Sequence, residues 1–286
     1  MDIEHSVFNF KPWNKSLMKL GILSDIHVDI NQEAGKPVLE GLKAAITSKG
    51  LDKMIIAGDM ASDYQLTLAC LHELEDDTGV ECLFVPGNHD IWNESHPDIT
   101  AWDAYERLKA HHGNLVNGPR SLVGDWVVVG DLGWYDYSFG SPDFSIEEFD
   151  CMKIDDRLWQ DKVKAIWGRS TREMHTYFYD KLKQQLKAHE GKKIIFVIHV
   201  LPIIEFTVQE PDRMWSYLNA FLGSAQYGEL ALEHDVRYAI CGHVHYRKQE
   251  CISNTEFICN CLNYSDQWIK DDPAEEIAHV MKVIEI

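Results

Sequence analysis

Short apolar runs recur along the chain and give the first indication of its fold. Runs of this kind, each bounded by Gly, Pro or polar residues, are typical of buried strands. In the run at 193–198, for example, Ile, Phe and Val fill every position after the first. The pattern predicts strands at residues 17–23, 53–57, 83–85, 126–129, 193–198, 237–241, 256–261 and 279–286.

Helical periodicity separates the first four of these strands. Residues 37–49, 64–75 and 99–110 place apolar side chains three or four positions apart, which lines one face of a helix, and Gly50 is a suitable stop for the first. Strands that alternate with helices favour a parallel sheet with right-handed crossovers. We therefore expect an α/β protein, organised as a single domain over residues 1–286.

The segment 131–190 differs from this alternation. It begins with aromatic residues set among Gly, Ser and Pro, and it continues as a charged helical stretch. An insertion of this size between two core strands is typical of a lid or cap over a site. An ordinary helical crossover with a long loop is the alternative.

The charge of the chain narrows the class of partner. The sequence of 286 residues has a formal net charge of −19, which repels a long polyanion such as duplex DNA. A small phosphorylated ligand stays compatible with this charge, because a bound divalent cation reverses the local potential. We expect no long nucleic acid as a partner, and the sequence does not indicate an oligomeric state.

The cysteines and the N-terminal residues indicate a compartment. Seven cysteines at scattered positions do not form a paired disulfide framework, and the pair Cys259 and Cys261 is more typical of core packing than of a metal site. Residues 1–19 lack the apolar stretch of a signal peptide, and no window reaches the ~18 apolar residues of a membrane span. The expectation is a cytoplasmic protein without a membrane segment.

Polar residues follow five of the predicted strands and supply the candidate chemistry. They are Asp25 and His27, Gly58 and Asp59, Gly87 to Asp90 (Gly-Asn-His-Asp), His199, and Gly242 to His245 (Gly-His-Val-His). If the backbone stays extended, Asp25 and His27 project from one face of their strand, and His243 and His245 do the same on theirs. Carboxylate and imidazole groups so placed are a natural half-site for a divalent metal.

The order and context of these motifs resemble the calcineurin-like metallophosphoesterase superfamily. The resemblance implies a four-layer α/β/β/α sandwich of two mixed sheets with flanking helices. It also implies two metal ions. The residues at the matching positions are Asp25, His27 and His245 for one ion, Asn88, His199 and His243 for the other, and Asp59 as the bridge between them. Nitrogen and oxygen ligands without cysteine suit Mn, Fe, Zn, Co or Ni.

His89 is the motif residue that the resemblance assigns to catalysis rather than to metal. It implies that His89 donates a proton or a hydrogen bond to the substrate while a metal-bound hydroxide attacks phosphorus. In the serine/threonine phosphatase branch an Asp three positions after the bridging Asp orients this His, and here that position is Ser62. The sequence therefore departs from that branch and leaves Asp63 and Asp90 as candidate catalytic partners, with a helix N-cap as the other reading of Asp90.

The implied activity is hydrolysis of a small phosphomonoester or phosphodiester, with nucleotide-like substrates among the candidates. The predicted substrate contacts are Asn88, His89, Trp134, Tyr135 and Arg247. Packing is the favoured alternative for the aromatic residues from Trp134 to Phe139. Arg157, Arg169 and Arg172 are further candidates for binding a phosphate, with surface solvation as the default. A non-catalytic interaction module with the same fold, or a nuclease acting on short substrates, is the competing interpretation.

Overall fold

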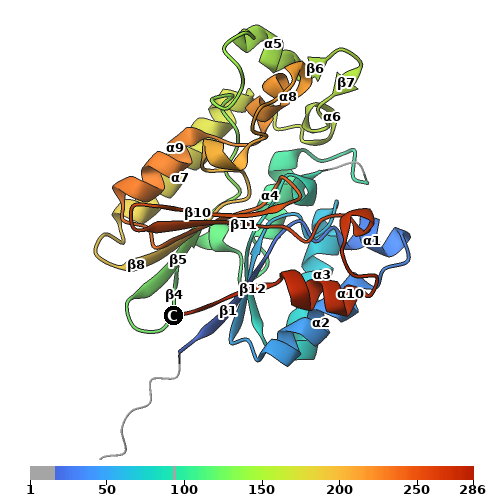
Figure 1. The fold of residues 1–286 in the computed structure, drawn as a ribbon, viewed down its shortest axis with the longest axis vertical. Coiled ribbons are helices and arrows are strands. Elements are labelled where there is room, and N and C mark those ends of the chain that lie inside the picture. Colours follow the sequence, from blue (N-terminus) through green and yellow to red (C-terminus); the bar gives the residue numbers. More distant parts are fainter. Residues whose placement is uncertain (1–16, 93–94) are drawn as a thin grey trace, which may run out of the picture.

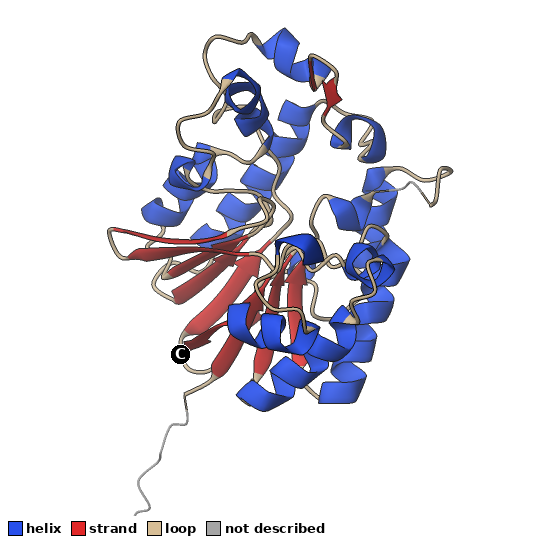
Figure 2. Cartoon of the chain, turned by 45° about the vertical axis from the view of Figure 1, so that its right-hand side comes forward, coloured by secondary structure: helices blue, strands red, loops and turns tan. Residues whose placement is uncertain are grey.

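Two β-sheets pack face to face, with helices on the outer face of each, in the computed structural model of residues 17–92 and 95–286 (Figures 1 and 2). One sheet has the strand order β12-β1-β2-β3 and the other has the order β10-β11-β9-β8-β5-β4, while β6 and β7 form a small separate hairpin. Both large sheets mix parallel and antiparallel neighbours. The predicted four-layer α/β/β/α sandwich is confirmed.

The strands of the described residues are β1 Lys19–Leu23, β2 Lys53–Ala57, β3 Glu81–Val85, β4 Arg120–Ser121, β5 Trp126–Gly130, β6 Lys153–Ile154, β7 Arg157–Leu158, β8 Lys193–Val197, β9 Tyr238–Cys241, β10 Arg247–Ile252, β11 Thr255–Asn260 and β12 Lys282–Glu285. The α-helices are α1 Val28–Glu33, α2 Val38–Lys49, α3 Tyr64–Thr78, α4 Ala101–Leu108, α5 Ile146–Cys151, α6 Asp161–Lys164, α7 Thr171–Lys187, α8 Arg213–Leu218, α9 Ala225–Glu233 and α10 Pro273–Val280. Short 3₁₀ turns lie at η1 His89–Ile91, η2 Leu115–Asn117, η3 Ile204–Phe206, η4 Asn219–Phe221 and η5 Ser265–Gln267.

Burial on both faces explains why the strands read as continuous apolar runs. On β2, Ile55 and Ala57 face the layer between the two sheets, and Met54 and Ile56 face the outer helices. Strands covered on both faces need apolar side chains at successive positions, not at alternate ones. The same burial holds on β8, where residues 194–197 are all inaccessible to solvent.

Backbone hydrogen bonds join the two sheets at their carboxyl ends. The amide of Ser24, just after β1, donates to the carbonyl of Asn260 on β11 at 3.0 Å. The amides of Leu262 and Asn263 then donate to the carbonyls of Ser24 and Asp25 at 2.9 and 3.3 Å. The loops that follow the strands of both sheets therefore converge at one end of the molecule.

Several elements differ from the sequence-based prediction. The predicted strand at 279–286 is too long, because α10 continues to Val280 and β12 begins at Lys282. Strand β10 and helix α9 were not predicted. Polar side chains occupy much of β10, the edge strand of its sheet, so that the apolar pattern of a buried strand is missing there.

The predicted insertion at 131–190 has two structurally different parts. Its last part is α7, which packs Leu182 and Leu186 into the core beside Val127 of β5 and is an ordinary crossover helix. Its middle part, residues 141–170, carries α5, β6, β7 and α6, which stand with α8 above the carboxyl ends of the sheets in Figure 1. We call residues 141–170 the cap segment. A lid function for it stays a prediction.

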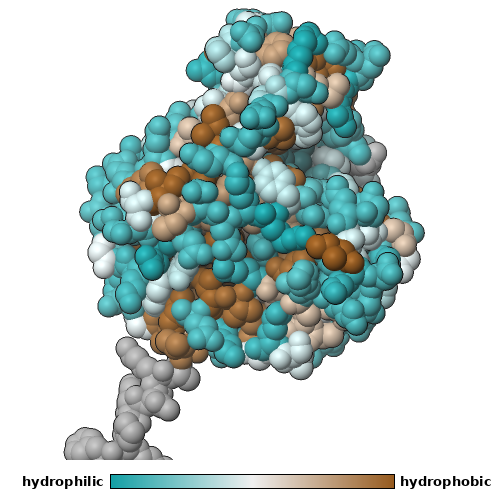
Figure 3. Space-filling view, in the orientation of Figure 1, coloured by the Kyte–Doolittle hydropathy of each residue, from teal (hydrophilic) through white to brown (hydrophobic). Residues whose placement is uncertain are grey.

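The surface and the helices of the described residues can be compared with the predictions about charge and membrane segments. Most of the face seen in Figure 3 is hydrophilic, in keeping with the charged composition. Among the described helices, none is both long and apolar enough to cross a membrane. The prediction about a signal peptide concerns residues 1–19, and 1–16 of these lie outside the described residues.

Candidate metal centre

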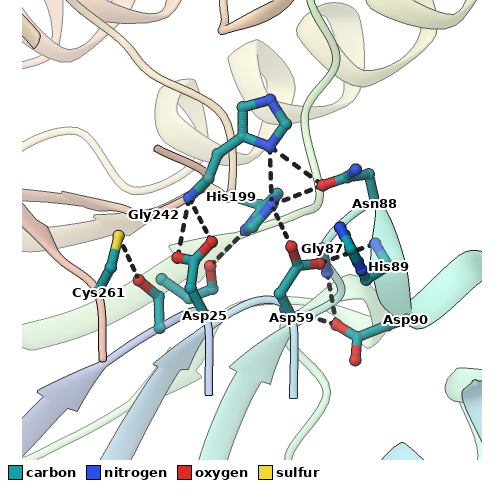
Figure 4. Close-up of polar contacts among 12 residues, drawn as sticks. Asp25, Asp59, Gly87, Asn88, His89, Asp90, His199, Gly242 and Cys261 are labelled. Carbon is teal, nitrogen blue, oxygen red and sulfur yellow. Dashed lines mark hydrogen bonds and ion pairs between the residues drawn. The ribbon is translucent and has the colours of Figure 1, made fainter. Parts of the chain in front are cut away.

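Loops from both sheets bring all seven predicted metal ligands to one place. Asp25, Asp59 and Asn88 follow β1, β2 and β3 of the smaller sheet, while His199 and His243 follow β8 and β9 of the larger one. Figure 4 shows Asp25, Asp59, Asn88 and His199 converging, with His199 between the carboxylates and Asn88. His27 and His245 complete the group and, with Asp25, form a set whose ligand atoms lie within 4.8 Å of one another.

The backbone at these ligands is left-handed rather than extended. Asp25, His27, Asp59, His243 and His245 have φ values of 50°, 45°, 56°, 77° and 55°. The expectation that Asp25 and His27, or His243 and His245, project from an extended strand is therefore wrong. The strands have already ended, and each chain turns sharply away from the sheet. Residues in this region are uncommon outside glycine and cluster at functional sites.

Two glycines are required because the loops approach one another closely. A Cβ atom at Gly87 would lie 2.1 Å from the Asp59 carboxylate, and one at Gly242 would lie 2.4 Å from the Asp25 carboxylate. A Cβ atom cannot lie within 3.0 Å of another heavy atom unless the backbone or the neighbouring side chain shifts. Any side chain at these two positions would displace a candidate ligand, so the glycines belong to the site.

Asn88, His199 and His243 direct one amide oxygen and two ring nitrogens at a common point. The Nδ1 of His199 lies 2.8 Å from the carbonyl of Ala57, so Nε2 is the nitrogen available for a metal. In His243 the roles are reversed, because Nε2 lies 3.1 Å from the carbonyl of Phe221 and Nδ1 is available. These two available nitrogens are 3.2 Å apart, and each is 3.0 Å from the Oδ1 of Asn88.

Asp25, His27 and His245 form the neighbouring group, and Asp59 lies between the two groups. The Nε2 atoms of His27 and His245 are 3.1 Å apart, and that of His245 is 3.6 Å from the Asp25 carboxylate. One oxygen of Asp59 is 3.3 Å from the Nε2 of His199 and 3.9 Å from the Nε2 of His27. Asp59 is therefore placed to contact a cation in either group.

Burial and neighbouring charges set the protonation of the ligand histidines. Burial and the neighbouring His245 lower the pKa of His27 to about 3, and burial with the neighbouring His199 does the same for His243, so both rings are neutral at pH 7. Burial also opposes a charge on His199, but the Asp59 carboxylate outweighs it and raises the pKa of His199. A cation that binds at His199 therefore displaces a proton.

These residues fit divalent cations of the first transition series. The donors are neutral imidazole nitrogens, carboxylates and one amide oxygen, and their partners outside the site leave the ligating atoms directed inward. The thiol labelled in Figure 4, Cys261, lies 3.5 Å from the hydroxyl of Ser24 and also interacts with the Asp25 carboxylate, behind the ligating atoms. Binding of the cations by these seven side chains stays a prediction.

His89 lies beside this group without the partner that the sequence suggested. Its Nδ1 is 3.3 Å from the hydroxyl of Ser62, and its ring stacks on Trp92 with 3.6 Å between ring centroids. Asp63 is elsewhere: it caps α3 by accepting from the amides of Gln65 and Leu66. The prediction that Asp63 acts with His89 is therefore wrong, and Ser62 occupies that place.

Asp90 holds the backbone of the site rather than acting on substrate. Its buried carboxylate accepts hydrogen bonds from the amides of Asp59, Met60, Ala61 and Gly87 and from the hydroxyl of Thr67, at 2.6 to 3.2 Å. Burial raises the pKa of Asp90, and the hydrogen-bond donors offset part of that cost of the ionised form. Both sequence-based readings of Asp90, catalytic partner and helix N-cap, are wrong.

Comparison with known proteins places this site in a family. The family model described as calcineurin-like phosphoesterase matches residues 18–247, which is most of the chain and includes all seven candidate ligands. The chain belongs to the calcineurin-like phosphoesterase family. A search of the curated proteins found no match.

Solved structures share the fold at low sequence identity. A structure described as phosphopantetheinyl hydrolase from Mycobacterium tuberculosis has a TM-score of 0.71 and 14% identity, with 94% of this chain and 96% of that chain covered. A dimetal phosphatase from Danio rerio has a TM-score of 0.54 and 16% identity over 85% and 87% of the two chains. TT1561 of Thermus thermophilus has a TM-score of 0.52 and 14% identity over 94% and 99%. These similarities show the fold alone.

A cavity of about 550 Å³ opens beside the candidate metal centre of this calcineurin-like phosphoesterase. The cap segment supplies part of its wall, including Arg157 and Trp159, while Trp92, Trp215 and Tyr264 come from other segments. Asn88 and His89, two of the predicted substrate contacts, line the cavity, and a contact with substrate stays a prediction. Of the candidate arginines, Arg157 is the one that lies here.

The other predicted substrate contacts lie outside the lining of this cavity. Trp134 and Tyr135 are 1% and 0% exposed and pack in the core, beside a separate cavity near the start of α7. The favoured packing interpretation describes them. Arg247 donates to the carbonyl of Cys261 at 3.0 Å, and Arg169 and Arg172 line clefts elsewhere. A direct substrate contact by Trp134, Tyr135 or Arg247 has no support in this arrangement.

A second cluster of metal-type residues has a structural explanation. His72, Glu75 and His111 come together between α3 and the end of α4. The Nδ1 of His111 accepts from the amide of Gly113, so its Nε2 carries the proton and donates to Glu75 at 3.1 Å. Since both ring nitrogens are engaged within the chain, His111 joins two segments of the fold and presents no nitrogen to a cation.

Sequence reasoning missed several residues of the site. Ser62, Trp92, Trp159, Asp161 and Tyr264 all contact or line it, and none was among the predicted site residues. Ser62 alone had a signal, because it occupies the position of the orienting Asp in a related branch. The others are brought in by folding of distant segments.

Proposed function

We propose that this protein hydrolyses a small phosphomonoester or phosphodiester at a centre of two divalent metal ions. The observation that carries the proposal is the convergence of ligand atoms from five loops at the floor of a cavity. Asn88, His199 and His243 face one point, Asp25, His27 and His245 surround another, and Asp59 lies between. Such an arrangement suits two cations that share a carboxylate.

The chain's own residues hold and polarise the phosphate in this proposal. Bound cations would lower the pKa of the attacking water and spread the charge that develops on the phosphoryl oxygens. His89 stands at the edge of the centre, with its amide fixed to Asp59 at 2.8 Å. If the Ser62 hydroxyl donates to Nδ1, the Nε2–H of His89 faces the cavity and donates to the phosphoryl or leaving-group oxygen.

The residues that line the cavity indicate what kind of leaving group the substrate carries. Three indole rings, those of Trp92, Trp159 and Trp215, line it together with Leu158 and Leu218. Arg157 at its edge supplies a guanidinium for a second anionic group. We infer a small substrate with a flat or apolar leaving group, which includes nucleotide-like compounds, and we expect a long nucleic acid to be rejected by the acidic chain.

Initial rates on the metal-reconstituted protein test the proposal. The substrates are a p-nitrophenyl monoester, a p-nitrophenyl diester, 2′,3′- and 3′,5′-cyclic nucleotides and a short oligonucleotide. A phosphopantetheinyl conjugate joins the panel because one structural neighbour is described as acting on that group. Turnover that requires Mn, Fe, Zn, Co or Ni and disappears in Asp59→Asn supports the proposal.

Two other outcomes would favour the competing interpretations. Cleavage confined to the oligonucleotide would identify a nuclease of short substrates. Bound metal without turnover on any member would move the substrate outside this panel, and neither metal nor turnover would favour a non-catalytic module. A cytoplasmic location is a separate prediction, which cell fractionation checks.

A further inference from the structure

A single carboxylate of the cap segment reaches down into the metal centre. Asp161, the first residue of α6, is 3% exposed, although the cap segment itself stands above the sheets. It accepts hydrogen bonds from Asn88 Nδ2 at 2.9 Å, Trp92 Nε1 at 2.8 Å, Trp159 Nε1 at 2.9 Å and Tyr135 OH at 3.3 Å. These donors come from widely separated parts of the chain.

The two indole contacts require Asp161 to accept, because an indole N–H only donates, and Asn88 and Tyr135 also act as donors to it here. Each donor is an uncharged amide, indole or hydroxyl group, and two donors meet each carboxylate oxygen. An ionised carboxylate is an acceptor at both oxygens, so it satisfies the whole set, which no other side chain of that size does. The chemistry of the position therefore specifies Asp.

The contact with Asn88 decides which end of the amide faces the cations. An amide has a donor end and an acceptor end that exchange places on a half-turn of the side chain. Because Asp161 takes the donor end, the Oδ1 of Asn88 is directed at His199 Nε2 and His243 Nδ1, at 3.0 Å from each. Without this carboxylate, the NH₂ end could face the centre, where it cannot bind a cation.

The contacts with the two indoles position the cavity wall. Trp92 stacks on His89 with an interplanar angle of 28°, and Trp159 stacks on Phe221 with ring centroids 5.4 Å apart. Both indoles line the cavity, and both donate their N–H groups to the Asp161 carboxylate. The Asp161 side chain thus orients the candidate metal ligand Asn88. It also orients the indole of Trp92, which stacks on His89, and the indole of Trp159 in the cavity wall.

We propose that Asp161 is a positioning residue that couples the cap segment to the cation site of Asn88, His199 and His243. The inference rests on the proposed function, since it concerns the same centre. It goes further in assigning to the cap segment a role in metal binding, where a cap would otherwise act only on substrate.

Calorimetric titration with Mn²⁺ of the chelated wild type and of Asp161→Leu tests this role without turnover. Loss of the orienting partner of a metal ligand typically weakens binding about 10- to 100-fold. We expect that loss for one of the two cations in Asp161→Leu and little change for the other. Asp161→Asn, which keeps one acceptor oxygen for Asn88, should recover most of the affinity. Glu147→Leu, an exposed acid of the same cap segment, should bind as the wild type does.

A double-mutant cycle with Asn88→Ala shows whether the effect passes through Asn88. If it does, Asp161→Leu should weaken Mn²⁺ binding no further in the Asn88→Ala background. Equal losses at both cations, additive losses in the double variant, or wild-type affinity in Asp161→Leu would each overturn the inference. If Asp161→Leu fails to fold, the Asp161→Asn and Asn88→Ala pair carries the same test through a smaller coupling.

The wild-type titration separates the two proposals. Two cations bound by the wild type with no turnover on the substrate panel would count against the proposed reaction. The role of Asp161 would then still be decided by the Mn²⁺ titrations of its variants. A wild type that binds no cation would contradict both the proposed function and the inference about Asp161. Emission from the cavity tryptophans gives a second readout, because Asp161→Leu removes the acceptor of Trp92 and Trp159 and should shift it while Glu147→Leu does not.

Discussion

Replacing Asp90 by Asn isolates the hydrogen bonds that hold the bridging carboxylate in place. In the wild type, one oxygen of Asp90 accepts from the amides of Asp59 and Gly87. The other oxygen accepts from the amides of Met60 and Ala61 and from the Thr67 hydroxyl. The side-chain amide in Asp90→Asn has the shape of the carboxylate but only one acceptor oxygen. In its better orientation it still presents an NH₂ group to two buried N–H groups.

The size of the effect follows from those two lost acceptors. A buried donor left without a partner costs about 1–3 kcal/mol, so two of them cost about 3–5 kcal/mol after partial relaxation. A loss of 1 kcal/mol lowers the melting temperature of a domain near this size by about 2–4 °C, which gives a decrease of about 10 °C. A typical domain is stable by about 5–15 kcal/mol, so the variant should still fold.

Thermal unfolding in a chelator, followed by circular dichroism, measures this decrease without a contribution from bound cations. Thr67→Val is the matched control, since it removes one of five donors and leaves the carboxylate with the other four. It should cost about 1 kcal/mol, or about 3 °C. A change below about 2 °C in Asp90→Asn would refute the reasoning, as would a larger effect in Thr67→Val than in Asp90→Asn.

The other predictions concern activity and metal binding. His89→Ala should keep its metal but lose about 10²–10⁴-fold in kcat, whereas Ser62→Ala should lose only about three- to tenfold, and equal losses would mean that Ser62 acts on substrate itself. Gly242→Ala should weaken metal binding about tenfold because its methyl group displaces Asp25, and isothermal titration with an unchanged affinity would contradict the close approach. Arg157→Ala should raise KM about tenfold for substrates with a second anionic group and leave KM unchanged for those without one, which steady-state kinetics on both kinds would check.

The strands and the family were predictable because their signals are local. A run such as 193–198 is apolar throughout because both of its faces are covered, and this pattern survives in the sequence whatever lies on either side. The motifs around Asp59, Asn88 and His243 are also local in sequence, since a glycine directly precedes each ligand, although the group that each glycine makes room for comes from another segment. The family assignment followed from those motifs and is confirmed.

Contacts between distant segments were not predictable in the same way. Asp161 is 73 positions from Asn88, and the intervening sequence gives no sign that the two meet. An Asp beside two lysines in a charged stretch is typical of a solvated surface, and that is how such a residue would be interpreted from sequence alone. The same limit applies to Trp92 and Trp159, whose indoles are brought together by one carboxylate from the cap segment.

The error about an extended backbone at the ligands has a physical consequence for the site. Left-handed φ values cost an L-residue on the order of 1 kcal/mol each, so the five ligands that adopt them need support from the chain. That support is visible at Asp59, whose amide donates to Asp90 and whose carbonyl accepts from the amides of Ile26 and His27. The amide of Asp25 donates in turn to the carbonyl of Gly58. Hydrogen bonds between the loops therefore support the ligands in this left-handed arrangement. A site prepared in this way loses little conformational entropy on binding, which is why substitutions behind the ligands, at Asp90 and Asp161, test the centre as directly as substitutions of the ligands themselves.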